Sequence, residues 1–171
     1  SRRQRQMCIR DRAHMYSTWA ANKGKLNLEN CQAVGLAKTY CYDRLITDSG
    51  AAGTALATGH KTRYHAVGVD PEGKPLLTLT DLAAAKGKST GVVVTCRLND
   101  ATPAAFCAHN SDRDQAEALI ADYAGCGVDF IFGGGKRYFC ERKDGRNILE
   151  EMKALGYQTP ENQEQLNAIQ T

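Results

Sequence analysis

The sequence has no long hydrophobic run, and no apolar stretch approaches the roughly 18 residues that a membrane-spanning helix needs. It shows no secretory signal, because the opening Ser1-Arg2-Arg3 is followed by no apolar segment. If the protein is exported, we therefore expect its signal to lie outside this sequence. Internal repeats and low-complexity tracts are also absent. With 171 residues, 42% of them hydrophobic and 24% charged, the composition is that of an ordinary globular domain.

The net charge of +3 does not indicate a nucleic-acid-binding surface. Residues 1–12 contain five arginines and one aspartate, so they contribute +4 and the remaining residues carry −1. That remainder has no basic surface interleaved with aromatic residues, which argues against specific nucleic-acid binding. Because residues 1–12 differ so much in composition from the rest, we interpret them as a non-native leader, such as sequencing read-through. Residues 13–171 are expected to be a fragment of a single domain.

The seven cysteines include no C-x-x-C pair and no zinc-ribbon spacing, which argues against a structural zinc site. Setting Cys8 aside with the leader leaves six, an even number that is compatible with disulfide bonds. The apolar surroundings of Cys96 and Cys107 favour reduced, buried thiols. Cys126 and Cys140 could instead form a bridge in a peripheral loop, so cysteine usage leaves the cellular compartment open.

Helical and strand patterns alternate in the second half of the chain. Residues 91–96 and 128–132 are short apolar runs of the kind that parallel sheets bury, and the second ends at three glycines, read as a turn. Residues 34–46 are predicted to be extended. Helices are predicted over 51–58, from 79 to Gly87, from Thr102 as N-cap, over 116–123 and over 148–155. This alternation predicts an α/β fold with a largely parallel sheet.

The segment Ile46-Thr47-Asp48-Ser49-Gly50-Ala51-Ala52-Gly53-Thr54 places a serine where an extended segment ends and a small-residue helix begins. Free backbone N–H groups and the positive end of that helix are expected to face whatever Ser49 attacks. A serine hydroxyl is a weak nucleophile until a base or a metal ion activates it. From spacing alone, Ser49 is better explained as a helix cap than as a nucleophile, although both interpretations remain open.

This segment resembles the alkaline phosphatase nucleophile signature, which is Ile or Val, any residue, Asp-Ser, a run of small residues and then Thr. Gly50 departs slightly from it, because many members have Ala directly after the serine. Three further segments resemble family landmarks in the same order: LNDATPAA at 98–105, HNSDR at 109–113 and FGGGKRYF at 132–139. The resemblance covers roughly residues 35–139. It implies a partial, alkaline-phosphatase-like three-layer α/β sandwich, truncated at both ends.

By that resemblance, Ser49 would be the nucleophile, would form a phosphoserine intermediate and would touch one zinc ion. Arg113 would bind two non-bridging phosphate oxygens through its planar guanidinium, and Asp48 would help to hold the site. Asp100 and Thr102 would supply oxygen ligands to Mg²⁺, although Thr102 is also explained as the N-cap before Pro103.

The family uses two zinc ions and one magnesium ion. Its D-G-M-G-like motif upstream of the nucleophile, which carries a metal-binding aspartate, is absent from this sequence. The downstream zinc ligands and a magnesium-binding glutamate are absent too, and none of the four histidines matches a ligand position of the family.

Three functional hypotheses follow. The first is a fragment of a phosphomonoesterase whose complete form acts on phosphate monoesters, is exported and is a homodimer, as the family implies. The second is a related metal-dependent hydrolase of phosphodiesters or sulfate esters, which the pairing of Asp48-Ser49 with Arg113 disfavours. The third is a non-catalytic α/β fragment that binds phosphate weakly, and it is the interpretation preferred for the isolated chain.

Overall fold

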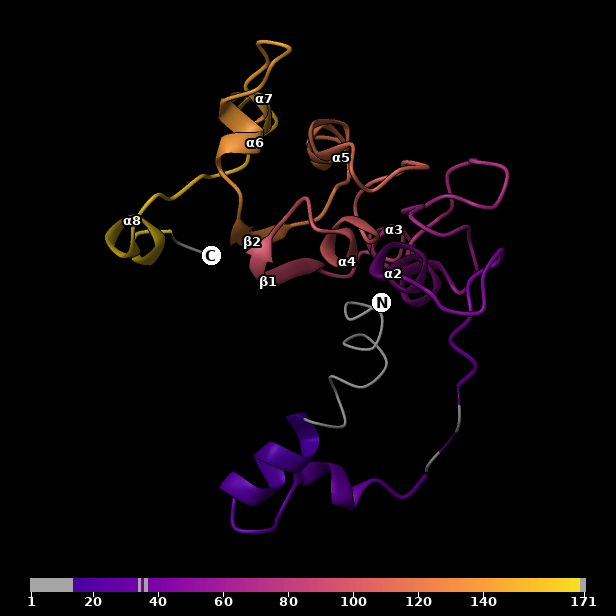
Figure 1. Cartoon of the computed structure of the whole chain (residues 1–171). Helices are drawn as coiled ribbons and strands as arrows, with labels where there is room; N and C mark the ends of the chain where they lie inside the picture. The colour runs from indigo at the N-terminus through magenta and orange to yellow at the C-terminus, as the bar shows by residue number, and fades with distance from the viewer. Residues whose placement is uncertain (1–13, 34, 36, 170–171) are drawn as a thin grey trace.

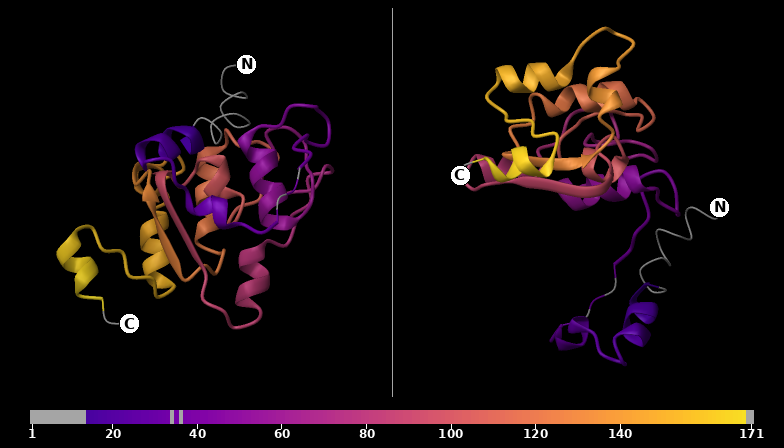
Figure 2. Two further views of the ribbon diagram at one scale, coloured as in Figure 1. Left: turned by 90° about the horizontal axis from the view of Figure 1, so that it is seen from below. Right: turned by 90° about the vertical axis from the view of Figure 1, so that its left-hand side faces the viewer.

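The computed structural model describes residues 14–33, 35 and 37–169. Residues 14–21 are helical and are followed by a 3₁₀ helix, η1 (Asn27–Asn30). Figures 1 and 2 show this N-terminal part lying apart from the main body, which begins near α2 (Ser49–Thr58). Within the described ranges no helix is both long and apolar enough to cross a membrane. The interpretation of residues 1–12 as a leader falls on residues outside this description.

Two parallel strands, β1 (Gly91–Arg97) and β2 (Phe130–Gly134), form the sheet at the centre of the main body (Figure 1). Gly91 lies opposite Phe130 and Val93 opposite Phe132, and an irregularity precedes the pairing of Arg97 with Gly134. The connection between the strands contains α4 (Ala101–Ala104) and α5 (Ala116–Tyr123). The expected mixed α/β fold with a small parallel sheet is therefore confirmed.

Helices cover one face of this sheet. Figures 1 and 2 show α5, α6 (Arg137–Cys140) and α7 (Ile148–Ala154) on the same side of the two strands. Val92 is buried on that side, whereas the aromatic rings of Phe130 and Phe132 stack on each other on the opposite side and are about half exposed. The buried residues of this core are Val92, Leu98, Cys107, Ile120, Tyr123, Val128, Phe139, Ile148 and Met152.

A second core, made mostly of alanines, joins α2 to α4. Its buried residues are Ala57, Val67, Ala101, Ala104, Ala105, Ala108 and Leu119. Small side chains let the two helices approach closely, because a Cβ on Gly53 would lie only 3.1 Å from the Cβ of Ala105. The sequence thus brings together the beginnings of the two helices that carry the candidate site residues.

Most of the predicted helix ends agree with the structure. Helix α2 ends at Gly59, whose φ of +76° closes it in the left-handed conformation. Helix α3 (Leu79–Ala84) begins with a capping box between Thr78 and Asp81, and the chain after it turns at Gly87, where φ is +65°. Helix α8 (Gln163–Asn167), near the end of the described chain, was not predicted.

Three local predictions were wrong. Thr102 is not an N-cap, since Asp100 holds that position and Thr102 is an exposed residue of α4. The predicted turn at the three glycines begins too early, because Gly133 and Gly134 belong to β2. Glycine is needed there for close approach, since a Cβ on Gly133 would lie 2.8 Å from Val94 Cγ2. Cys96, expected to be buried, is exposed, whereas Cys107 is buried as expected. All described cysteines are free, so the Cys126–Cys140 bridge that the sequence left open is not formed.

The segment predicted to be extended, residues 34–46, forms no strand in its described part. Side-chain contacts with residues 61–64 hold it instead. Lys61 Nζ lies 3.8 Å from the ring centroid of Tyr40, and the guanidinium carbon of Arg44 lies 4.1 Å from that of Tyr64. Cation–π contacts, together with hydrogen bonds such as that from the Tyr42 N–H to the Thr62 carbonyl oxygen at 2.9 Å, hold the segment without a strand ladder.

Candidate active site

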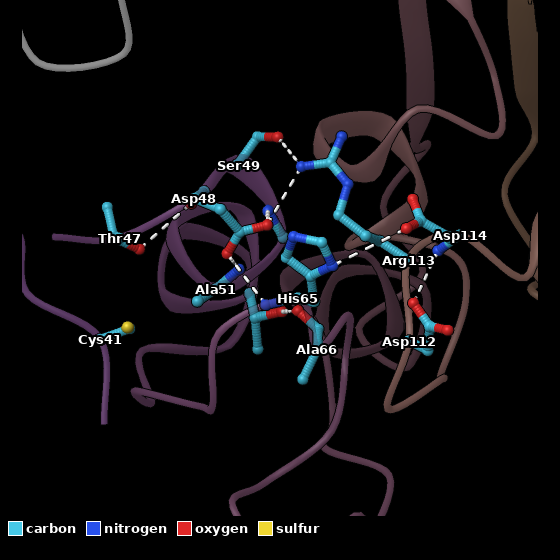
Figure 3. Close-up of polar contacts among 12 residues, drawn as sticks. Cys41, Thr47, Asp48, Ser49, Ala51, His65, Ala66, Asp112, Arg113 and Asp114 are labelled. Atoms are coloured by element: carbon cyan, nitrogen blue, oxygen red, sulfur yellow. Dashed lines mark hydrogen bonds and ion pairs between the residues drawn. The ribbon is translucent and has the colours of Figure 1, made fainter. Parts of the chain in front are cut away.

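Asp48 is the N-cap of α2, so the interpretation of Ser49 as the helix cap was wrong. Its carboxylate accepts hydrogen bonds from the N–H groups of Gly50 at 2.9 Å and Ala51 at 3.1 Å. The prediction that these N–H groups would be free to face the attacked group was therefore wrong, because the preceding carboxylate already uses them. The cap still aims Ser49, the first residue of the helix, away from the helix body (Figure 3).

Arg113 reaches the same place from a distant part of the chain. Its Nη1 donates to Asp48 Oδ2 at 3.1 Å and makes a close hydrogen bond with Ser49 Oγ (Figure 3). Arg113 lies in the loop before α5 rather than on the first turn of that helix, and its side chain is 24% exposed. The structure thus brings together Ser49 and Arg113, the residues that the resemblance implies as nucleophile and phosphate ligand.

The Asp48 carboxyl is nearly buried but remains charged. Burial alone raises its pKa, but the N–H groups of Gly50, Ala51 and His65 and the Arg113 guanidinium together outweigh that effect and hold the pKa below its usual value. Asp48, ionised at neutral pH, can therefore both cap α2 and orient the guanidinium of Arg113.

Gly50, the departure from the family signature, has a structural reason. A Cβ at this position would lie 2.9 Å from the carbonyl oxygen of Ala66 and 3.4 Å from the carbonyl carbon of His65. Buried Thr54 holds the same loop, because its Oγ1 accepts the Gly68 N–H at 2.8 Å. The loop of residues 65–68 is thus packed so closely on α2 that alanine at position 50 would require it to move.

Asp100 and Thr102 lie at the start of α4, beside α2. A Cβ on Gly53 would be 3.4 Å from Thr102 Cα, so the α4 backbone contacts α2 one turn after Ser49. The carboxylate and hydroxyl oxygens of these two residues are of the type that Mg²⁺ prefers. Asp100 Oδ1 is engaged with Arg97 Nη2 at 2.8 Å, so binding a cation there requires Asp100 to exchange its arginine partner for the metal.

The described residues contain one group of three metal-binding side chains, formed by His65, Asp112 and Asp114. Figure 3 places this group on the Arg113 side of the site, with His65 Nδ1 3.8 Å from Asp114 Oδ2. No comparable group surrounds Ser49 within the described part of the chain. The residues described here therefore do not by themselves provide the zinc ligands that the resemblance implies.

The place of His65 beside Asp48 and Arg113 was not predicted, because the family resemblance gives no histidine a metal-ligand position in this sequence. His109 is held away from the site by other contacts: its backbone N–H donates to Asp122 Oδ2 at 2.8 Å, and its Nε2 lies 3.0 Å from the Leu76 carbonyl oxygen. The signal that could have singled out His65 is its place in a tight loop, Tyr64-His65-Ala66-Val67-Gly68. A long-range contact with Asp48 leaves no trace in local sequence.

Comparison with known proteins gives one consistent result. Residues 8–171 match the family model described as alkaline phosphatase. The chain is 47% identical over 121 residues to alkaline phosphatase 4 of Bacillus subtilis (strain 168), covering 67% of this chain and 26% of that protein. It is 34% identical over 185 residues to streptomycin-6-phosphate phosphatase of Streptomyces griseus, covering 91% of this chain and 41% of that protein.

Solved structures agree with this result. The alkaline phosphatase from the Antarctic bacterium TAB5 matches with a TM-score of 0.80 and 32% identity, covering 87% of this chain and 45% of that chain. A histidine-to-aspartate mutant of the TAB5 enzyme, which has magnesium bound in its M3 site, matches with a TM-score of 0.78 and 35% identity, covering 82% of this chain and 40% of that chain. The chain thus spans less than half the length of each of these relatives, and it belongs to the alkaline phosphatase family.

Proposed function

We propose that the full-length gene product hydrolyses phosphate monoesters through a phosphoserine intermediate on Ser49. The observation that carries this proposal is the contact between Ser49 Oγ and the Arg113 guanidinium, both anchored by Asp48. Attack on a phosphate group requires a nucleophile beside a positively charged group that binds the phosphate oxygens, and the planar guanidinium of Arg113 is such a group.

In this reaction Ser49, Arg113 and Asp48 have different roles. Ser49 Oγ loses its proton and bonds to the phosphorus, the bond from phosphorus to the alcohol oxygen breaks, and the leaving oxygen takes up a proton to give the alcohol. Water then attacks the phosphoserine, which releases inorganic phosphate and restores the serine hydroxyl. Arg113 would hold two non-bridging oxygens throughout, because its charge and geometry match the phosphoryl group in both steps. Asp48 would keep that guanidinium aimed at the serine.

The proposal includes the metal ions of the family. Asp100 and Thr102 would be ligands of Mg²⁺, and Ser49 would touch one of two zinc ions whose other ligands come from segments outside the described residues. Such ions lower the pKa of a bound hydroxyl and stabilise the leaving oxygen. The donor types at Asp100 and Thr102 support the magnesium assignment, while the ion pair with Arg97 is the feature that opposes it.

For the isolated 171-residue chain we propose phosphate binding without turnover. The specific observation is that Ser49, Asp48 and Arg113 are assembled, whereas no group of three metal-binding side chains surrounds Ser49 within the described residues. Without metal activation, a serine hydroxyl remains a weak nucleophile. Export and homodimer formation of the full-length product remain part of the proposal, by analogy with the family. Hydrolysis of phosphodiesters or sulfate esters is disfavoured by the pairing of Ser49 with Arg113.

The test is hydrolysis of a chromogenic phosphate monoester at alkaline pH with Zn²⁺ and Mg²⁺. The 171-residue chain is compared with the full-length gene product and with its Ser49→Ala variant. We expect activity only in the full-length product and its loss in Ser49→Ala. Activity that survives Ser49→Ala would refute the proposed nucleophile, and activity of the isolated chain would refute the second proposal.

A further inference from the structure

His65 connects the two halves of the candidate active site through its backbone. Its N–H donates to Asp48 Oδ1 at 3.1 Å, and its carbonyl oxygen accepts the Arg113 N–H at 2.8 Å. Because Arg113 Nη1 also donates to Asp48 Oδ2 at 3.1 Å, the three residues form a closed ring of hydrogen bonds. The distance between the helix that bears Ser49 and the loop that bears Arg113 is therefore set through His65.

The conformation of His65 is unusual for its residue type. Its φ is +71°, and Lys23 is the only other non-glycine residue with positive φ in the described part of the chain. This left-handed region costs energy for residues with a side chain and most for β-branched ones. Rotating φ out of this region would turn the His65 N–H away from Asp48, so the strained conformation is needed for the ring of hydrogen bonds.

The His65 ring reinforces the same connection. Nδ1 lies 3.8 Å from Asp114 Oδ2 (Figure 3). The ring also stacks on Tyr64, with 4.5 Å between ring centroids. Asp114 directly follows Arg113 in the same loop. The ring and the backbone of His65 thus hold two successive residues of the arginine loop.

On the basis of the phosphomonoesterase function proposed above, we propose that His65 is a positioning residue for Arg113. Its left-handed backbone keeps the guanidinium beside Ser49 Oγ, and it acts through Asp48 and Arg113 rather than on the phosphate. A substitution that disturbs this backbone should therefore weaken the binding of phosphate oxygens. A substitution that accepts positive φ should largely preserve it.

The experiment uses the full-length gene product with Zn²⁺ and Mg²⁺ and measures the inhibition constant of inorganic phosphate together with kcat and KM. In His65→Val, a β-branched residue disfavours positive φ, and we expect the inhibition constant to rise about tenfold. In His65→Gly, which accepts this φ, we expect a rise of about threefold at most. Lys23→Val is the matched control, because it places the same strain at a distant left-handed position, and it should leave the inhibition constant unchanged.

A double-mutant cycle separates positioning from general destabilisation. In an Arg113→Ala background, His65→Val should cause no further rise in the phosphate inhibition constant, because the group that His65 positions is gone. Additive effects in the cycle, or equal effects of Val and Gly, would overturn the proposal. If His65→Val does not fold, His65→Ala provides the same cycle with a milder strain.

The failure of this proposal is distinguishable from failure of the proposed function. Loss of activity in Ser49→Ala together with wild-type phosphate inhibition in His65→Val would refute only the role of His65. Activity retained in Ser49→Ala would refute the function on which that role rests.

Discussion

Arg113 Nη1 bridges Asp48 Oδ2, at 3.1 Å, and the hydroxyl of Ser49, although 65 positions separate Arg113 from Asp48. The carboxylate is 7% exposed and the guanidinium 24% exposed, so water screens this pair only partly. The charge of Asp48 thus has two uses: it caps α2 and it fixes the direction of the cation that faces the nucleophile.

Removing the guanidinium should impair catalysis more than stability. In the full-length gene product, we expect Arg113→Ala to lower kcat/KM for a chromogenic monoester by about 100-fold or more, since charge stabilisation in the transition state is lost. Arg113→Lys should recover only part of this loss, because lysine is a point charge without the planar fork. Arg137→Ala, on the exposed part of α6, serves as the charge-matched control. Equal kcat/KM for Arg113→Ala and the wild type would contradict the assignment.

The ionised Asp48 carboxylate should stabilise the folded protein at neutral pH and should lose this effect at acidic pH. Because its pKa in the folded protein lies below that of an aspartate in the unfolded chain, its contribution is fully present above the unfolded pKa and is lost as the pH falls through the folded pKa. Asp48→Asn cannot titrate. We therefore expect this variant to be less stable at pH 7, and the difference in unfolding free energy between wild type and variant to narrow as the pH falls below the unfolded pKa of aspartate. Urea unfolding as a function of pH measures both, and a constant gap would refute the prediction.

Gly68 should tolerate no side chain. Its φ is +65°, and a Cβ there would lie 2.0 Å from the Ala108 carbonyl oxygen. We expect Gly68→Ala to destabilise the full-length protein by more than about 4 kcal/mol, since both strain and a backbone clash arise. Gly73→Ala is the matched control, because φ is +85° but the space around it is open. It should cost about 1–2 kcal/mol from φ alone, and equal unfolding midpoints for the two variants would show that the clash is relieved.

Much of the fold could be predicted because the signals are local. The stripe of Leu119, Ile120 and Tyr123 is helical in α5 and buried as expected. Gly59 ends α2 as its sequence position indicates, since only glycine adopts positive φ without cost. Each of these features depends on residues within a turn or two of each other, which is the range over which hydrophobic periodicity and capping act.

The parts of the site that could not be predicted depend on contacts between distant segments. The sequence around Gly50 does not reveal that the Ala66 carbonyl oxygen leaves no room for a methyl group at position 50. Nor does the sequence around His65 predict its hydrogen bond to Asp48. Arg97 and Asp100 are close in sequence, but an i, i+3 spacing does not determine whether the carboxylate pairs with the arginine or binds a metal ion. Long-range packing and competition between partners decide these positions.

The Tyr123 hydroxyl should stabilise the turn that leads to Asp100. The ring is fully buried, and its hydroxyl donates to the Leu98 carbonyl oxygen at 2.8 Å. Tyr123→Phe would leave that carbonyl without this donor, and we expect a loss of about 1–2 kcal/mol in the free energy of unfolding. Tyr157→Phe removes a similar bond, 2.8 Å to the Val128 carbonyl, from a partly buried ring and should cost less. Chemical denaturation compares the two, and a larger effect at Tyr157 would contradict this ranking.

The ion pair between Arg97 and Asp100 should compete with magnesium. Arg97 Nη2 lies 2.8 Å from Asp100 Oδ1, so a cation that uses this carboxylate must displace the guanidinium. We expect Arg97→Gln in the full-length gene product to tighten Mg²⁺ binding about two- to fivefold, since partly exposed ion pairs are worth at most about 1 kcal/mol.

Arg137→Gln is the control for this experiment. Arg137 donates to the Tyr138 hydroxyl, as Arg97 does, but it has no bond to Asp100. The Arg137→Gln substitution removes a positive charge beside the same tyrosine and should leave the Mg²⁺ affinity unchanged. Titration calorimetry with Mg²⁺ gives the affinity directly, without relying on turnover. Asp100→Ala should abolish the difference between Arg97→Gln and the wild type, because the carboxylate for which the two cations compete is then gone. Tighter binding that persists in the Asp100→Ala background would mean that Arg97 repels magnesium at another site.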